Sequence, residues 1–194
     1  MRDWASIEVN SRAGLRSWLE ANYRQTEPIW LISAKKAAGA SYIPYPEIVE
    51  EALCWGWVDS LPRALDATRS MLLISPRKTG SAWSAPNRER VNRLISRGLM
   101  QPAGLAKAVA AKADGLWSFL TSAENGVEPE DLRCALDANL AARQGYNAFS
   151  GPVRRRILES LLRAKGSDTR AARILKIVEG AATGLDPLAW KPKR

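Results

Sequence analysis

The segment Glu50–Ser60 reads Glu-Glu-Ala-Leu-Cys-Trp-Gly-Trp-Val-Asp-Ser and contains the change from helical to extended chain that decides the fold. The residues around its start predict a helix from Glu47 to Trp55, and Gly56 ends that helix because glycine is a poor helix former. From 57 to 65 and again from 69 to 75 the chain has the pattern of short strands. We therefore predict an antiparallel hairpin directly after the helix.

The flanking sequence adds a third strand and several helices. An apolar run with β-branched and aromatic residues at 29–34 indicates the strand. Capping residues, prolines and glycines predict helices near 11–23, 87–97 and 102–113, and three more that begin near 128, 150 and 169. The fold class is thus expected to be α+β, with a small three-stranded antiparallel sheet and helices in the N-terminal part, followed by an all-helical C-terminal part.

These elements divide the chain into three expected regions. An α+β domain with the tryptophan-rich motif covers residues 1–120, and a helical subdomain covers 128–182, with 121–127 as the boundary between them. Residues 183–194 contain two prolines and end in Lys-Pro-Lys-Arg, so we expect a loosely ordered basic tail there.

Composition excludes several kinds of chemistry. The 194 residues include no histidine, which excludes Ser-His-Asp and Cys-His catalytic arrangements and histidine-ligated metals. The two cysteines, Cys54 and Cys134, lie too far apart in sequence for a zinc motif, and each is expected to be a core residue. We therefore predict no metal and no cofactor.

The N-terminus has no apolar signal region and no segment is apolar enough to span a bilayer, so a cytoplasmic protein without membrane insertion is expected.

The net charge of +9 is concentrated in two blocks. Residues 63–107 carry 9 basic and 2 acidic side chains, and residues 150–194 carry 11 and 4. Such blocks can attract anions, including nucleic acid, or can complement acidic parts of the same fold. The arginines that would contact phosphates lie on predicted helices, and they are Arg88, Arg90, Arg93, Arg97, Arg154, Arg155, Arg156, Arg163, Arg170 and Arg173.

The tryptophan-rich motif is the main candidate for a binding site. Large apolar rings beside a few polar groups are typical of ligand pockets, although they also occur in tightly packed cores. A loop with cations, hydroxyls and a glycine follows the hairpin and leads into a helix, so its backbone could hold an anion, or Ser84 could simply cap that helix. The candidate binding residues are Trp30, Trp55, Trp57, Arg77, Ser81, Trp83 and Ser84.

Two carboxylates near the tryptophans are candidates for acid–base catalysis. A carboxyl group packed against indole rings has a raised pKa, and helical spacing turns Glu51 inward while Glu50 faces solvent. Asp59 follows on the first strand of the hairpin. A structural use is favoured for both, since structural ion pairs also perturb pKa values, and Asp59 could simply pair with Arg63 or cap a turn.

Several motifs together resemble a known bacterial family. They are Glu-Ala-Leu-Cys-Trp-Gly-Trp-Val-Asp-Ser at 51–60, Ser-Pro-Arg-Lys-Thr-Gly-Ser-Ala-Trp-Ser-Ala-Pro-Asn-Arg-Glu-Arg-Val at 75–91, Gly-Leu-Met-Gln-Pro-Ala-Gly at 98–104, and the pair Pro-Glu-Asp-Leu at 129 and Thr-Arg-Ala-Ala-Arg-Ile at 169. This combination is similar to the YdeI/OmpD-associated family. The resemblance implies protection against bacteriocins and cationic antimicrobial peptides, a porin partner and a periplasmic location.

Three hypotheses for function follow. The first is a cytoplasmic stress or antimicrobial-tolerance protein that binds a small amphipathic or anionic ligand in a pocket lined by tryptophans. The second is a histidine-free hydrolase or lyase that uses Glu51 or Asp59 as acid or base, with Arg77 stabilising developing negative charge. The third is a nucleic-acid-binding protein that uses the basic helices. The sequence makes no prediction about the oligomeric state.

Overall fold

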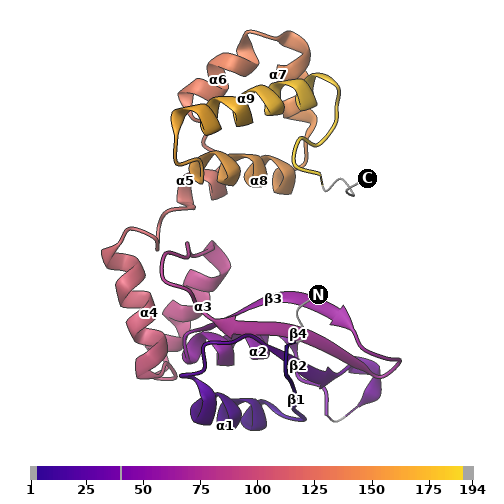
Figure 1. The fold of residues 1–194 in the computed structure, drawn as a ribbon, viewed down its shortest axis with the longest axis vertical. Coiled ribbons are helices and arrows are strands. Elements are labelled where there is room, and N and C mark those ends of the chain that lie inside the picture. The colour runs from indigo at the N-terminus through magenta and orange to yellow at the C-terminus, as the bar shows by residue number, and fades with distance from the viewer. Residues whose placement is uncertain (1–3, 40, 190–194) are drawn as a thin grey trace. The chain divides into compact units, whose positions relative to one another are not determined.

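The computed structural model describes residues 4–39 and 41–189 and has α+β architecture (Figure 1). The chain forms two compact units, the first ending at Trp117 and the second beginning at Ser118. The first unit contains the sheet and four of the α-helices, and the described part of the second unit contains helices and connecting turns. Within 4–39 and 41–189, no helix combines the length and apolar character needed to cross a membrane.

The sheet of the first unit has four strands in the order β1-β2-β4-β3. They are β1 (Ser6–Glu8), β2 (Ile29–Ala34), β3 (Trp57–Ala64) and β4 (Arg69–Pro76). β4 pairs antiparallel with both β2 and β3, whereas β1 pairs parallel with β2. The three strands expected from the sequence are present, but the prediction of a three-stranded antiparallel sheet is wrong because the sheet is four-stranded and mixed.

β1 was missed because its sequence pattern is too short to detect. It has only three residues, and a single polar–apolar–polar alternation is too short to indicate a strand. Its register is set by long-range backbone bonds, from the Trp30 amide to the Ala5 carbonyl (2.9 Å) and from the Val9 amide to the Ile32 carbonyl (3.0 Å). A strand held in this way depends on its partner rather than on its own sequence.

β3 pairs irregularly with β4 along its length. The register shifts between Asp59 and Pro62, where the strand contains a bulge or a comparable irregularity. Pro62 has no backbone N–H to donate to a ladder, and proline in a sheet is largely confined to edges and bulges. β3 is an edge strand in the sheet order, which accommodates both features.

The helices of the first unit begin at the expected signals. They are α1 (Arg12–Asn22), α2 (Tyr45–Cys54), α3 (Ala85–Ser96) and α4 (Pro102–Ala113), together with the short 3₁₀ turn η1 (Lys36–Ala38). The Ser11 side chain caps α1 by accepting a hydrogen bond from the Gly14 amide at 3.0 Å. The other three α-helices have proline in their first turn, where its missing N–H costs nothing.

The core of the first unit lies on one face of the sheet. Ile29 and Leu31 of β2 and Leu72 and Ile74 of β4 alternate onto this face and are buried there with apolar residues of α1 and α2. Trp30 belongs to the opposite face by the same alternation. Ile32, Met71 and Leu73 share that face with Trp30 and are half-buried there.

α4 packs unusually close to the end of α2. The Gln101 amide donates to the Cys54 carbonyl at 3.1 Å, and a Cβ on Gly104 would lie 2.3 Å from that same carbonyl oxygen. Only glycine permits this approach. Gly56 follows with φ of +77°, a left-handed conformation that lets the chain turn from α2 into β3.

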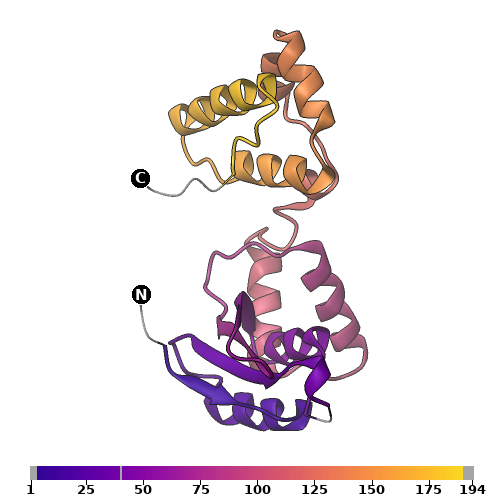
Figure 2. The ribbon, with the colours of Figure 1, turned by 90° about the vertical axis from the view of Figure 1, so that its right-hand side faces the viewer.

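The second unit is built, in its described part, from five helices (Figure 2). They are α5 (Thr121–Glu124), α6 (Glu130–Asp137), α7 (Leu140–Ala148), α8 (Gly151–Leu162) and α9 (Ser167–Ala182). α9 packs against α6, α7 and α8. Sequence signals did not predict α5, which is a single turn, or α7, which Asn139 caps by accepting from the Ala142 amide at 3.1 Å.

The core of this unit includes Leu132 and Leu136 of α6, both fully buried. The prediction that Cys134 is a core residue is wrong, because Cys134 is exposed. At 3.6 residues per turn, positions 132 and 136 share a face and position 134 lies on nearly the opposite one. Cys54, in contrast, is fully buried in the core of the first unit.

Part of the expected basic tail is packed onto the second unit. The Leu185 amide donates to the Gly180 carbonyl at 2.8 Å, Asp186 pairs with Arg156, and Pro187 is buried. These contacts order the chain as far as Ala189. Residues 190–194 of the expected tail lie outside the described residues.

The approach of α7 to α9 gives a test of the second unit. A Cβ on Gly145 would lie 1.8 Å from the Ala181 carbonyl oxygen, so Gly145→Ala should destabilise this unit by about 3 kcal/mol as the helices are forced apart. Gly151→Ala is the matched control, since a Cβ at that helical position meets no atom within 4 Å. Urea unfolding followed by circular dichroism would measure both, and equal stability of the two variants would contradict the packing described here.

Candidate functional site

Two of the four candidate tryptophans are part of the core. Trp57 is 0% exposed, stands edge-on to Trp18 with ring centroids 5.7 Å apart, and donates from Nε1 to the Tyr23 carbonyl at 3.2 Å. Trp83 is 1% exposed and packs against Trp117 at 5.1 Å. Both rings have the contacts expected of residues that stabilise a fold.

The other two candidates lie in separate places. Trp30 lies on the far face of the sheet, where the Arg63 guanidinium covers its ring at 4.9 Å. Trp55, the C-cap residue of α2, packs against Tyr23 with centroids 5.3 Å apart. The structure thus does not gather the four tryptophans around one cavity, but it does place Trp55 beside Arg77.

Trp55 and Arg77 both line an open cavity of about 810 Å³ in the first unit, here called the Arg77 pocket. Its wall comes from the chain after α1, the turn after α2, the end of β4 and the start of α4. The lining side chains that matter for its chemistry are Tyr23, Arg24, Glu27, Trp55, Arg77, Lys78 and Lys107. Its volume lies within the usual range for small-molecule pockets.

Arg77 is the unusual residue of this pocket. It is only 6% exposed, and its guanidinium lies over the Trp83 ring at 3.8 Å. One Nη donates to the backbone carbonyls of Ala82 (2.5 Å) and Ser81 (3.4 Å), while Nε is buried without a partner. No carboxylate of the described residues pairs with it. Burial lowers the pKa of Arg77 to about 10, so the side chain still carries its charge at neutral pH.

The position of Arg77 follows from the pairing of β4 with β3, which begins directly after the turn at Gly56. The Arg77 amide donates to the Gly56 carbonyl at 2.9 Å, which places the end of β4 beside the turn after α2. A Cβ on Gly56 would meet the Lys107 side chain at 3.0 Å and the Ala103 carbonyl oxygen at 3.1 Å. Glycine at 56 therefore brings the start of α4, with Lys107, to the same wall as Arg77.

The charges that line the pocket are mostly positive. Arg24, Arg77, Lys78 and Lys107 are cationic, and Glu27 is the one carboxylate among the residues named as its lining. Arg24 donates to the Tyr23 hydroxyl at 3.0 Å, so it is held at the rim. A surplus of cations around an aromatic wall favours a ligand that carries both negative charge and apolar surface.

Trp55 contributes a second buried polar group. It is 8% exposed, and its Nε1 is buried without a hydrogen-bond partner. Buried indole N–H groups usually have a partner, and leaving one unbonded costs free energy. Two such groups, on Trp55 and Arg77, therefore lie along one cavity.

The loop of residues 77–84 surrounds a smaller cavity of about 90 Å³ that shares Arg77 with the main pocket. Ser81 lines it, and its amide donates to the Lys78 carbonyl at 3.3 Å across a turn with Gly80 at φ +82°. Ser84 occupies the N-cap position of α3, but its side chain makes no capping hydrogen bond. Its backbone carbonyl accepts from the Arg88 amide at 3.0 Å.

Glu51 is a buried ion-pair residue. It is 1% exposed, and its oxygens accept from Arg12 Nε (2.6 Å) and Arg16 Nε (2.9 Å). Glu50 also pairs with Arg12, at 3.2 Å. Since both carboxylate oxygens of Glu51 are occupied by guanidinium groups, this geometry ties α1 to α2 and leaves no free oxygen for a substrate.

Asp59 contacts α2 rather than Arg63. Its Oδ2 accepts a hydrogen bond from the Tyr45 hydroxyl at 2.5 Å, which fastens the hairpin to the first turn of α2. Burial, together with this bond to Asp59, raises the pKa of Tyr45 to about 12. Neither Glu51 nor Asp59 lines the Arg77 pocket.

Sequence patterns did not identify Tyr23, Arg24 or Lys107 as pocket residues. Tyr23 and Arg24 follow the end of α1, and Lys107 lies on a predicted helix that is distant in sequence from Trp55. The contact at Gly104 brings Lys107 to the pocket, whereas Tyr23 is held there by the hydrogen bond from Trp57 and by packing on Trp55. The small residues Ala103 and Gly104 after Pro102 were the one available signal of such a contact.

Comparison with known protein families assigns the two parts of the chain separately. Residues 7–107, just over half of the 194-residue chain, match the family model described as a domain of unknown function, DUF8412. The chain belongs to the DUF8412 family. The Arg77 pocket is formed almost entirely within this DUF8412 segment.

Residues 126–184 match the family model described as Bacteriocin-protection, YdeI or OmpD-Associated. The resemblance to that family is therefore confirmed, through a segment of the second unit. The motifs at 51–60, 75–91 and 98–104 lie instead in the DUF8412 segment. No curated protein and no solved structure gives a significant match to the chain.

Burial of the tryptophans predicts their response to a charged quencher. Trp57→Phe and Trp83→Phe should each leave the iodide-accessible part of the emission unchanged, because neither ring reaches solvent. Stern–Volmer plots with iodide, compared with acrylamide, would measure this, with near-ultraviolet circular dichroism as the check on folding. Loss of the iodide-accessible fraction in either variant would show that its ring lines an open cleft.

The two cysteines should differ sharply in reactivity. Cys54 is fully buried, and burial raises its pKa to about 11, while the exposed Cys134 has its pKa raised by a hydrogen bond to Glu130. Ellman's reagent should therefore label one thiol in the native chain and both after denaturation. The native labelling rate should keep rising above pH 9, and Cys134→Ser should abolish it. Rapid native labelling of Cys134→Ser would contradict the burial of Cys54.

Proposed function

We propose that the first unit binds a small amphipathic anion in the Arg77 pocket. The observation that supports this most directly is the buried guanidinium of Arg77, which has two carbonyls and an indole face as neighbours but no carboxylate. A charge withdrawn from water without a counter-ion costs several kcal/mol, so a fold that keeps one gains if a ligand supplies the opposite charge.

The apolar part of the ligand would contact Tyr23 and Trp55. Their rings form one wall of the cavity and are packed together at 5.3 Å, so they present a continuous aromatic surface. Aromatic side chains gain free energy both from burial and from ring-to-ring contact. An acidic group at Arg77 and Lys107 with a ring or alkyl chain against Trp55 would use both walls at once.

This binding role suits a protein of antimicrobial tolerance. The second unit contains the segment that matches the bacteriocin-protection, YdeI or OmpD-associated model. We propose that the chain acts in the cytoplasm during stress and sequesters an amphipathic molecule in its first unit. The ligand's charge is expected to be negative, because cations dominate the lining of the pocket.

A pair of dyes that differ only in charge tests this proposal. 1-Anilinonaphthalene-8-sulfonate carries a sulfonate, and N-phenyl-1-naphthylamine has the same ring skeleton without it. We expect the sulfonate dye to bind more tightly and Arg77→Met to weaken its binding by about tenfold or more, since a hydrogen bond to a charged group contributes roughly 1.5–3 kcal/mol. Dye fluorescence and quenching of tryptophan emission would both follow the titration.

Three control measurements make the result specific. Arg97→Met removes a cation from the exposed C-cap of α3 and should leave the dissociation constant unchanged. Arg77→Lys keeps the charge and should retain much of the affinity. The uncharged dye should bind wild type and Arg77→Met alike. If the two dyes bind equally well, or if Arg77→Met and Arg97→Met behave alike, the pocket is not an anion site.

A further inference from the structure

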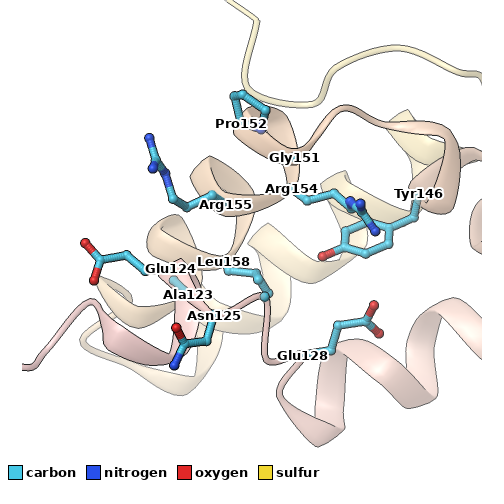
Figure 3. A pocket seen from close by; sticks show the side chains of 11 residues that line it. Ala123, Glu124, Asn125, Glu128, Tyr146, Gly151, Pro152, Arg154, Arg155 and Leu158 are labelled. Carbon is cyan, nitrogen blue, oxygen red and sulfur yellow. The ribbon is translucent and has the colours of Figure 1, made fainter. Parts of the chain in front are cut away.

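The second unit contains a separate cavity of about 550 Å³ around the start of α8, here called the Arg154 pocket (Figure 3). One wall is the end of α5 with the chain that follows it to residue 128, and the other is the first two turns of α8. Tyr146 of α7 closes one end of the pocket. Ala123 and Leu158 give it an apolar floor, so the pocket offers space for more than an ion.

Arg154 is distinguished by its lack of a partner. Arg143 pairs with Glu128 at 2.9 Å, Arg170 pairs with Asp131, and Arg156 pairs with Asp186, so several arginines of this unit are neutralised within the fold. The Arg154 side chain has no hydrogen bond or ion pair to any described residue. The side chain is exposed and lines the Arg154 pocket, where it remains available to an anion.

Tyr146 supplies a side-chain donor at the same place. The residue as a whole is 1% exposed, yet its hydroxyl is not among the polar atoms sealed from solvent, and within residues 4–39 and 41–189 it makes no hydrogen bond. Figure 3 shows the Tyr146 hydroxyl pointing into the cavity. Burial raises the pKa of Tyr146 to about 12, so the group keeps its proton and remains a donor at neutral pH.

The N-terminus of α8 adds backbone donors. Gly151 is its first residue, Ser150 gives no side-chain capping bond, and the amides of Gly151 and Val153 have no acceptor within the helix. A Cβ on Gly151 would meet no atom within 4 Å, so the approach to this helix end is open. Helix N-termini attract anions through these free N–H groups and through the helix dipole.

The acidic side chains of the pocket do not cancel this positive field. Glu128 already accepts two hydrogen bonds from Arg143, at 2.9 and 3.2 Å. Glu124 lies at the opposite end of the cavity from Tyr146 in Figure 3. Arg155, the other cation of the lining, is only loosely paired with Glu159, at 3.7 Å.

We infer that the Arg154 pocket is a second anion-binding site, which takes a small organic molecule through its carboxylate or phosphate group. The acidic group would be bound by the Arg154 guanidinium, the Tyr146 hydroxyl and the Gly151 amide, and the rest of the molecule would lie on Leu158 and Ala123. This site is independent of the Arg77 pocket, because every residue that forms it belongs to the second unit.

Amide-resolved NMR titration of the ¹⁵N-labelled full chain tests the inference. The probes are phenyl phosphate and benzoate, with benzyl alcohol as the uncharged control and inorganic phosphate as the free-ion control. We expect both organic anions to shift the Gly151 and Val153 amides, benzyl alcohol to leave them unshifted, and inorganic phosphate to bind more weakly because it gains nothing from the apolar floor. The ratio of the phenyl phosphate and benzoate dissociation constants identifies the preferred acidic group.

Two variants and a matched control connect the shifts to the named groups. Arg154→Met should raise the dissociation constant by about tenfold or more, and Tyr146→Phe, which removes only the hydroxyl, by roughly two- to tenfold. Arg163→Met removes an exposed arginine from the C-cap of the same helix and should change nothing. Shifts that are absent at Gly151, or that persist with unchanged affinity in both Arg154→Met and Tyr146→Phe, would overturn the inference.

Discussion

The close approach of α4 to the last turn of α2 is the contact on which the first unit depends. Gly104 lets the backbone of α4 reach the Cys54 carbonyl, and Gly56 turns the chain immediately afterwards. As a result Trp55, Arg77 and Lys107, which come from three different elements, share one wall. A side chain at either glycine would separate the helix from the turn, so the geometry of the Arg77 pocket is a consequence of backbone packing rather than of the pocket residues themselves.

The first unit contains one buried charge that is paired and one that is not. Glu51 is enclosed by Arg12 and Arg16, so its charge is fully matched and serves to join α1 to α2. Arg77 is buried to a similar degree and has no such match. An unpaired buried charge lowers the stability of the fold, so the presence of Arg77 needs an explanation other than stability. The paired Glu51 needs no such explanation. Arg154 in the second unit is also unpaired, unlike Arg143 and Arg170, but it is exposed and its charge remains in contact with water.

Local sequence signals predicted most helices and strands correctly but not how these elements pack together. Prolines and capping residues located most helices, and two consecutive short extended runs predicted the hairpin. β1 could not be predicted, since three residues carry no period and its partner strand is distant in sequence. Cys134 was wrongly expected in the core because it lies between Leu132 and Leu136 in sequence. On a helix, however, its side chain points away from the face that the two leucines share. The tryptophans marked the right region, but of the four candidates only Trp55 lies on the Arg77 pocket, because composition does not show which way a ring points.

The irregular pairing of β3 affects the tendency of the protein to aggregate through its sheet edge. An edge strand of eight residues presents unpaired backbone groups that could recruit a strand from another molecule. Here Pro62 removes one donor, the register shift bends the ladder, and Asp59 and Arg63 place charge along the same strand. The sheet is therefore poorly suited to growth from this side, and the exposed hairpin is protected against strand-to-strand aggregation at high concentration.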